Sequence, residues 1–359
     1  MIIKNKLTIA FLALGSFFQI NAQEGESVTE STETKKEKVI NFMAVGDIML
    51  GTTFPNASYL PAKGVYPFKD VQNVFEKADV LFGNLEGTLT DTGKNAKRCK
   101  DPSKCYSFKS PQAFGNHFKK AGFDVVSIAN NHIGDFGSIG IKNTIKTLDD
   151  LGIENAGVLS KPITTFEKDG VKYGFIAFAP NKDCLKLNNV SKGIQLVKSL
   201  NNKVDIVIVS FHGGAEGTKH KNITRKTEYF YGENRGNVHS FAHKMIDAGA
   251  DLILGHGPHV PRAIEVYKGK FIAYSMGNFA TYKRFSMSGS KAYSPIFELK
   301  LKENGDFIDG KIHSALQTKT RYPFIDASEK AYKEIKTLTL QDFPENKIKF
   351  NDNGVIELK

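Results

Sequence analysis

Short apolar runs alternate with amphipathic stretches along the first two-thirds of the chain. Runs such as 80–82 and the Ile206–Val209 part of 204–209 are continuously apolar and too short for an ordinary helix, which is typical of buried strands. Between such runs, Ile141, Ile145 and Leu148 recur at helical spacing and predict an amphipathic helix. This alternation predicts an α/β fold. The predicted strands cover 39–45, 80–82, 124–128, 173–178, 204–209 and 251–254, and the predicted helices cover 70–77, 110–121, 141–151 and 238–248.

The predicted helix at 110–121 has sequence signals at both ends. Ser110 is a favoured capping residue, and Pro111 suits the first helical position. Gly122 follows the last apolar position and is expected to end the helix.

The last third of the chain has a β-rich pattern instead. It predicts a β-rich portion, covering 301–359, that packs on the same domain as residues 39–300. The predicted strands are 263–267, 271–274, 294–301, 311–316, 347–350 and 355–358, with one helix near 329–337. The whole pattern therefore predicts a mixed α/β sandwich.

Composition and charge narrow the classes of partner. The chain has 359 residues with 40% hydrophobic content, which is enough to bury a large core. Its formal net charge of +11 favours anionic partners. No lysine block is interleaved with aromatic residues, so we do not expect nucleic acid among the partners.

The first 38 residues predict export and a tether. Residues 1–23 combine Lys4 and Lys6 with an apolar segment and a small-residue exit, which indicates a secretory signal. Residues 24–38 are polar and charged and predict a flexible linker. No cysteine lies near the exit of the signal. We expect a periplasmic or secreted protein, or one tethered to the membrane by an uncleaved N-terminus.

The chain has three cysteines. In an oxidising compartment, Cys99 and Cys105 are expected to close a small surface loop as a disulfide. Cys184 is expected to be buried and inert.

Two histidines follow the apolar run at 252–254 on a short loop. His256 and His259 are separated by Gly257 and Pro258, which disfavour a continuing helix. Other predicted strands end in the same kind of residue, and the carboxyl ends of strands in an open α/β sheet lie beside one cleft. These further candidates are Asp47, Asn84, Glu86, Asn131, His132, Asp135 and His212.

Each candidate alone has an ordinary explanation. Asp47 suits a turn, and His212 suits a satisfied core position. Their shared position at strand ends favours a single site. Carboxylate, amide and imidazole ligands suit one or two divalent ions such as Mn, Fe or Zn. We expect the remaining histidines to be structural or surface residues, namely His117, His220, His239, His243 and His313.

Six motifs in order resemble the CapA family of capsule, or poly-γ-glutamate, synthesis proteins. They are GDIML, GNLEGTL, SIANNHIGDFG, SFHGG, GHGPHV and YSMGNF. That family is itself similar to the calcineurin-like metallophosphoesterases. The resemblance implies a four-layer α/β/β/α sandwich and an extracytoplasmic role on an anionic cell-envelope polymer, with membrane-embedded synthesis partners.

The resemblance also implies residue roles. Asp47, Glu86 and Asn131 would be metal ligands, together with His212, His256 and His259. His132 would transfer a proton, with Asp135 as its partner. We expect substrate contacts from Asn84, Glu216, Arg262 and Asn278. Further basic groups expected near the mouth are Lys219, Lys221, Arg225 and Arg284.

The sequence departs from the phosphoesterase pattern in three ways. Met49 stands where a histidine is expected, two residues separate the closing histidines, and the bridging aspartate is absent as such. Two hypotheses follow. The first is a metal-dependent hydrolase or transferase, and the second is a non-catalytic, polymer-binding subunit of a capsule assembly.

Overall fold

The computed structural model describes residues 38–97 and 106–359. The predicted signal, almost all of the predicted linker and the Cys99–Cys105 pair lie outside the described residues. None of the helices within this described part is long and apolar enough to cross a membrane.

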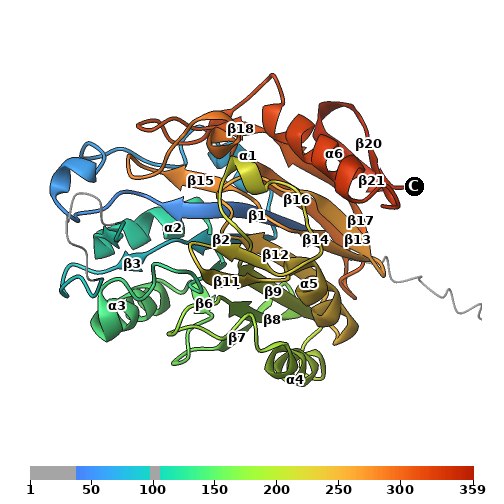
Figure 1. The fold of residues 1–359 in the computed structure, drawn as a ribbon, viewed down its shortest axis with the longest axis horizontal. Helices are drawn as coiled ribbons and strands as arrows, with labels where there is room; N and C mark the ends of the chain where they lie inside the picture. Colours follow the sequence, from blue (N-terminus) through green and yellow to red (C-terminus); the bar gives the residue numbers. More distant parts are fainter. Residues whose placement is uncertain (1–37, 98–105) are drawn as a thin grey trace, which may run out of the picture. The chain divides into compact units, whose positions relative to one another are not determined.

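A nine-stranded sheet is built around the longest strand, β1 (Figure 1). β1 pairs in parallel with β2, which continues through β5 to β6, and antiparallel with β16 on its other side. β15 also pairs with the end of β1. These strands are β1 (Val39–Met49), β2 (Val80–Leu85), β5 (Val125–Ser127), β6 (Glu154–Ala156), β15 (Asn278–Thr281), β16 (Ile296–Lys302), β17 (Phe307–His313), β20 (Ile348–Phe350) and β21 (Val355–Leu358).

A six-stranded sheet has a parallel centre and antiparallel edges. Its order is β13-β14-β12-β9-β8-β7, with the four central strands parallel. The strands are β7 (Ile163–Lys168), β8 (Val171–Phe178), β9 (Ile206–His212), β12 (Leu252–His256), β13 (Ile264–Tyr267) and β14 (Lys270–Ala273).

The two sheets pack face to face through apolar side chains. The rings of Phe82 in β2 and Phe175 in β8 are 5.6 Å apart, and those of Phe271 in β14 and Phe297 in β16 are 6.2 Å apart. All four rings are fully buried. Burying such a side chain contributes about 1.5–3 kcal/mol, so this inter-sheet layer is a major source of stability.

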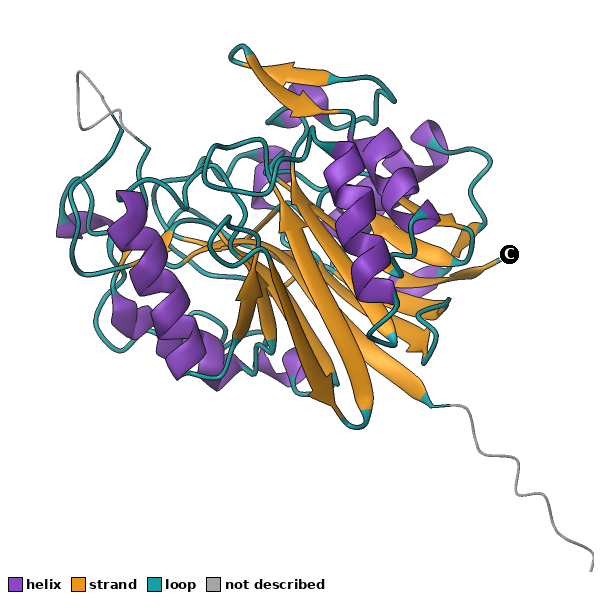
Figure 2. Ribbon diagram, turned by 90° about the horizontal axis from the view of Figure 1, so that it is seen from below, coloured by secondary structure: helices purple, strands orange, loops and turns teal. Residues whose placement is uncertain are grey.

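Helices cover the outer faces of the sheets (Figure 2). Phe241 of α5 packs on Phe178 and Phe211 of the six-stranded sheet, at ring distances of 5.2 and 5.8 Å. α3 contacts the edge strand β6 of the other sheet. The predicted four-layer α/β/β/α sandwich is therefore confirmed. The helices are α1 (Gln72–Phe75), α2 (Gly115–Ala121), α3 (Gly137–Asp150), α4 (Val190–Asn201), α5 (Val238–Asp247) and α6 (Lys330–Asp342).

The C-terminal strands belong to the nine-stranded sheet. β17 pairs with β16, and β21 and β20 extend the same edge. α6 lies against β17, β13 and β18 (Ala315–Leu316). Residues 301–359 therefore continue the sandwich.

The predicted helix start at Ser110 is wrong. Ser110 lies in the short strand β4 (Lys109–Ser110), which pairs with β3 (Thr88–Leu89), and its hydroxyl donates to the Gly51 carbonyl at 2.6 Å. A 3-10 turn at Gln112–Phe114 precedes α2. Because Ser110 pairs with β3 as part of a strand, the helix begins several residues later than predicted.

Candidate metal centre and binding pocket

Asp47 lies at an irregular point near the end of β1. The register of β1 shifts between Ala44 and Asp47 against β2, and between Asp47 and Met49 against β15. A side chain on Gly46 would overlap the Gly277 carbonyl oxygen, which accepts a 2.9 Å hydrogen bond from the Asp47 N–H. Because Gly46 has no side chain, Gly277, which directly precedes β15, can approach β1 and hold the backbone of Asp47.

Two imidazoles contact the Asp47 carboxylate. His256 Nδ1 lies 3.1 Å from Oδ1, and His259 Nδ1 lies 2.8 Å from Oδ2. Burial alone would raise the pKa of Asp47, but these two hydrogen bonds outweigh it and hold that pKa well below its usual range. Burial opposes protonation of His259, yet the Asp47 carboxylate raises the pKa of His259 to about 9.

Asn84 holds two carboxylates together. Its amide nitrogen donates to Asp47 Oδ1 at 2.9 Å and to Glu86 Oε2 at 2.8 Å. Asn84 is fully buried and stands opposite Asp47 in the register of β1 and β2. The Asn84 amide nitrogen therefore positions these two acids, and a contact between Asn84 and substrate stays a prediction.

Glu86 and His212 complete a buried cluster with Asp47. His212 Nδ1 lies 3.5 Å from Glu86 Oε2, and His212 is opposite His256 in the register of β9 and β12. Asp47, Glu86 and His212 each offer a ligand atom, and these atoms lie within 4.8 Å of one another. Burial, followed by repulsion from Asp47, raises the pKa of Glu86 to about 8. A cation here would offset both effects.

Several polar atoms around this cluster have no hydrogen-bond partner among the described residues. A buried polar atom left in this state costs about 1–3 kcal/mol, so it indicates a ligand that completes its coordination. The atoms are Glu86 Oε1, Asn131 Oδ1, His212 Nδ1 and Nε2, His256 Nε2 and Asn278 Oδ1. This donor set of carboxylate, amide and imidazole suits a divalent transition metal. The cluster is therefore able to hold such an ion.

His132 borders the cluster and is oriented by Asp135. His132 Nδ1 lies 2.8 Å from Asp135 Oδ2, and Nε2 lies 3.9 Å from Glu86 Oε1. Lys97 forms a 2.6 Å ion pair with the other Asp135 oxygen, and the Phe108 N–H donates to Oδ2. Burial lowers the pKa of His132, although Asp135 opposes this effect.

A pocket of about 520 Å³ opens beside these residues. Its lining includes Asn131, His132 and His259, together with both positive and negative side chains. The charged residues that line it are Lys97, Glu216, Glu233, Arg235, Arg284 and Lys291.

Arg235 is a functional candidate that the sequence analysis missed. It lies in β11 (Glu233–Gly236) and is 1% exposed, and its Nη1 contacts Glu233 at 3.0 Å and Glu216 at 3.3 Å. Its Nη2 is buried and has no hydrogen-bond partner among the described residues. The sequence signal that could have found it is the polar stretch after Gly232, in which Glu233 stands two residues before Arg235. Glu216, which the sequence analysis expected to contact substrate, also lines this pocket.

Arg262 does not reach the pocket, which corrects its predicted role. It is fully buried and binds both carboxylate oxygens of Glu228, at 3.1 and 2.8 Å, as well as the Ala215 carbonyl. Asn278 is also fully buried, and its amide nitrogen donates to the His259 and Lys291 carbonyls. Asn278 therefore supports the loop carrying His259.

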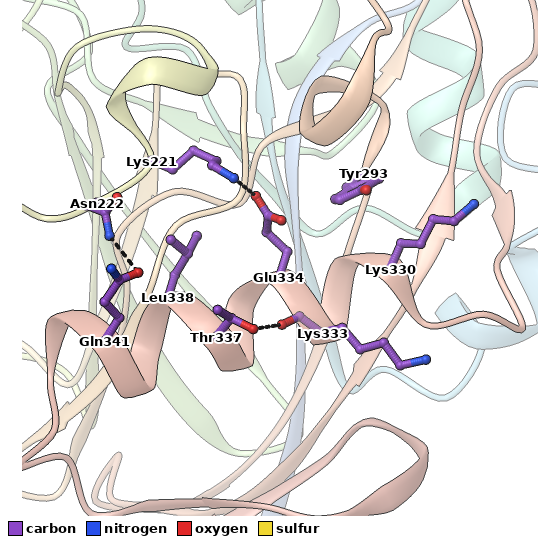
Figure 3. A pocket seen from close by; sticks show the side chains of 9 residues that line it. All are labelled: Lys221, Asn222, Tyr293, Lys330, Lys333, Glu334, Thr337, Leu338 and Gln341. Atoms are coloured by element: carbon purple, nitrogen blue, oxygen red, sulfur yellow. Dashed lines mark hydrogen bonds and ion pairs between the residues drawn. The ribbon is translucent and has the colours of Figure 1, made fainter.

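Two other basic residues expected near the mouth lie elsewhere. Lys221 forms a 2.7 Å ion pair with Glu334 in a separate pocket along α6 (Figure 3). Arg225 pairs with Glu345 at 2.5 Å. Both cations are neutralised locally.

The fold and the site define an α/β/β/α protein with a carboxylate–imidazole cluster able to hold a divalent ion. A family model described as bacterial capsule synthesis protein PGA_cap matches residues 41–283. The chain belongs to this family, as the motifs predicted.

Proteins with similar sequences agree with the assignment to this family. The capsule biosynthesis protein CapA of Bacillus anthracis is 27% identical over 332 residues, covering 86% of this chain and 75% of that protein. The PGA biosynthesis protein CapA of Bacillus subtilis is 28% identical over 298 residues, covering 78% and 73%. Among solved structures, a 5'-nucleotidase precursor from Thermus thermophilus has a TM-score of 0.43 and 13% identity, covering 86% of this chain and 59% of that one.

Proposed function

We propose that this protein is a metal-dependent hydrolase or transferase that acts on an anionic capsule polymer of the poly-γ-glutamate type. The observation that carries the proposal is the set of buried, unpartnered nitrogens of His212 and His256 beside Asp47 and Glu86. A metal ion accounts for these atoms together. The printed names of the Bacillus relatives support the choice of polymer.

The pocket suits an anionic substrate. Four cationic side chains line it against two carboxylates, and Arg235 carries a buried Nη2 that has no hydrogen-bond partner among the described residues. A guanidinium group recognises carboxylate or phosphate through paired N–H donors. Arg235 would therefore bind an anionic group of the substrate next to the cluster.

The chain's own residues position the reacting groups. Asp47, Glu86 and His212 would hold the ion, which supplies Lewis-acid activation of water and of the scissile group when bound. Asn84 keeps the two carboxylates in place, and His132 presents Nε2 toward Glu86 while Asp135 holds Nδ1. His132 is placed to exchange a proton with a substrate in the pocket.

The sequence of residues 1–23 supports action outside the cytoplasm, and we include this location in the proposal. Fractionation of cells that produce the full chain tests it directly. Recovery of all of the protein in the cytoplasmic fraction would contradict this part of the proposal.

A second candidate function is a non-catalytic, polymer-binding subunit. Met49 favours it, because a fully buried thioether stands two residues after Asp47, where the phosphoesterase pattern has an imidazole. In this case the same pocket and Arg235 would bind polymer without cleaving it.

Metal analysis followed by a hydrolysis screen separates the two functions. Protein purified without chelator is analysed for metals and then assayed on phosphoesters and γ-glutamyl amides, with His256→Ala as the comparison. Bound metal and an activity that this variant loses support the enzyme. Unchanged metal content and activity in the variant would reject it, and polymer binding without hydrolysis favours the second function.

A further inference from the structure

We infer that His239, His243 and Glu265 form a second, structural metal site that takes a divalent transition ion of the zinc class. His239 and His243 lie four residues apart in α5, and Glu265 lies in β13. Each offers a ligand atom, and these atoms lie within 4.8 Å of one another. Residues four apart share one face of a helix, so both imidazoles approach Glu265 from the same side.

Glu265 is held in a ligand-like position. Its Oε1 and Oε2 lie 3.1 and 3.0 Å from His243 Nε2, and the Tyr274 hydroxyl donates to Oε2 at 2.7 Å. Carboxylates that bind metals are typically fixed by such an outer hydrogen bond. The glutamate is thus oriented before any ion binds.

Aromatic rings fix the two imidazoles. Tyr267 stacks on His243 with ring centres 3.8 Å apart, and Phe343 lies parallel to His239 at 5.9 Å. The His239 and His243 rings are themselves 4.1 Å apart. Fixed rings lose little conformational entropy on binding an ion.

An ion pair between His243 and Glu265 would explain only part of this arrangement. It needs one histidine, whereas a ring nitrogen of His239 also lies within 4.8 Å of an oxygen of the same carboxylate. Two imidazoles and one carboxylate supply three of the four ligands of a tetrahedral zinc ion, and a water molecule would supply the fourth. The side chains of His243 and Glu265 are 21% and 11% exposed, so an ion reaches them from solvent.

This site is separate from the Asp47 cluster. His239 and His243 lie on α5, which covers the outer face of the six-stranded sheet, whereas His256 packs on Phe82 between the sheets. An ion at the second site would link α5 to β13. Its role is therefore structural.

Zinc binding in a background without His212 tests the inference. The full chain carrying His212→Gln is stripped with chelator, titrated with Zn²⁺ and analysed for zinc per folded chain and for thermal stability. We expect this chain to bind one zinc ion tightly during the titration, and we expect the bound ion to raise its Tm. Adding His239→Gln or Glu265→Gln should weaken binding at least about 10-fold and abolish the Tm increase.

His220→Gln is the matched control, because His220 is exposed and lies outside the cluster. It should leave zinc binding and the Tm increase unchanged. His239→Gln preserves the His243–Glu265 pair, so loss of binding in this variant cannot be attributed to a broken ion pair. Equal zinc content and equal Tm increase in the His239→Gln and His220→Gln chains would overturn the inference.

Discussion

His259 Nδ1 lies 2.8 Å from Asp47 Oδ2, although the two residues are 212 positions apart in the chain. The contact joins β1 of the nine-stranded sheet to the loop after β12 of the six-stranded sheet. His259 adopts a left-handed backbone conformation with φ of 58°, which is uncommon for a residue with a side chain. Strain of this kind is typical of functional sites.

Asp47→Asn is expected to weaken divalent metal binding at least about 10-fold while keeping the fold, because the amide preserves shape and removes the charge. Metal analysis after dialysis against a limiting concentration of Zn²⁺ or Mn²⁺ measures the effect. Asp309→Asn is the control, since Asp309 pairs with Lys300 at a partly exposed position. Equal metal content in both variants would contradict a role for Asp47 as a ligand.

Arg235→Lys is expected to lower affinity for γ-glutamate oligomers about 10-fold, a loss of about 1.4 kcal/mol. Lysine keeps the charge but lacks the forked donors of the guanidinium group. Isothermal titration calorimetry measures the affinity, and metal content should not change. Arg321→Lys serves as the comparison because Arg321 is 58% exposed and pairs with Asp70. If Arg235→Lys binds the oligomers as tightly as Arg321→Lys, Arg235 does not contact the polymer.

Cys184 is expected to resist alkylation in the native protein. It is fully buried, and burial raises the pKa of its thiol to about 12, so the reactive thiolate is rare at neutral pH. The test uses a Cys99→Ser/Cys105→Ser chain treated with iodoacetamide and examined by mass spectrometry. Under conditions in which the denatured protein is fully labelled, the native protein should remain unlabelled. Rapid labelling of the native chain would show that this region opens readily.

Glu298 is expected to stabilise the fold at neutral pH more than in acid. Burial would raise its pKa, but the 2.6 Å contact with His313 outweighs burial and lowers it. The lowered pKa contributes stability above the unfolded value for glutamate, and this stability is lost as pH falls through the folded pKa.

The measurement compares urea unfolding of the wild type and Glu298→Gln. The variant should be about 1 kcal/mol less stable at neutral pH, and the difference should shrink at about pH 3.5. Glu303→Gln, at an exposed position, should show no such trend. A difference for Glu298→Gln that stays constant with pH would contradict a contribution from the ionised Glu298 carboxylate.

The sequence predicted the sandwich because its central strands are continuous apolar runs. Such runs mark β8, β9 and β12, and the ends of β9 and β12 carry His212 and His256. Hydrophobic patterning failed where it is weak. The pattern did not predict α4, which contains Gly193, or the hairpin of β10 (Glu228–Phe230) and β11, which is rich in polar residues.

Within the predicted site, the candidate metal ligands could be inferred from the sequence, whereas the charged residues of the pocket could not. Asp47 and Glu86 lie together because the parallel strands β1 and β2 end side by side, which the pattern of strand ends indicates. His212 ends β9 of the other sheet and joins them because the two sheets pack face to face. Arg262 was expected at the pocket only because it is basic and near the histidines. Its partner Glu228 lies 34 residues away, and no local pattern predicts that pairing. Arg235 was missed because the hairpin that carries it was not predicted, and its contact with Glu216 is known only after folding.

The segment between β14 and β15 runs from the six-stranded sheet to the nine-stranded sheet. At its end, the Gly277 carbonyl accepts a hydrogen bond from the Asp47 N–H. This segment therefore links the two sheets both covalently and through that hydrogen bond. If the pocket takes a polymer, as proposed, Asp47 would stay anchored to both sheets while the polymer binds beside it. Selection among polymers would then depend on which chain end or side group can reach Asp47.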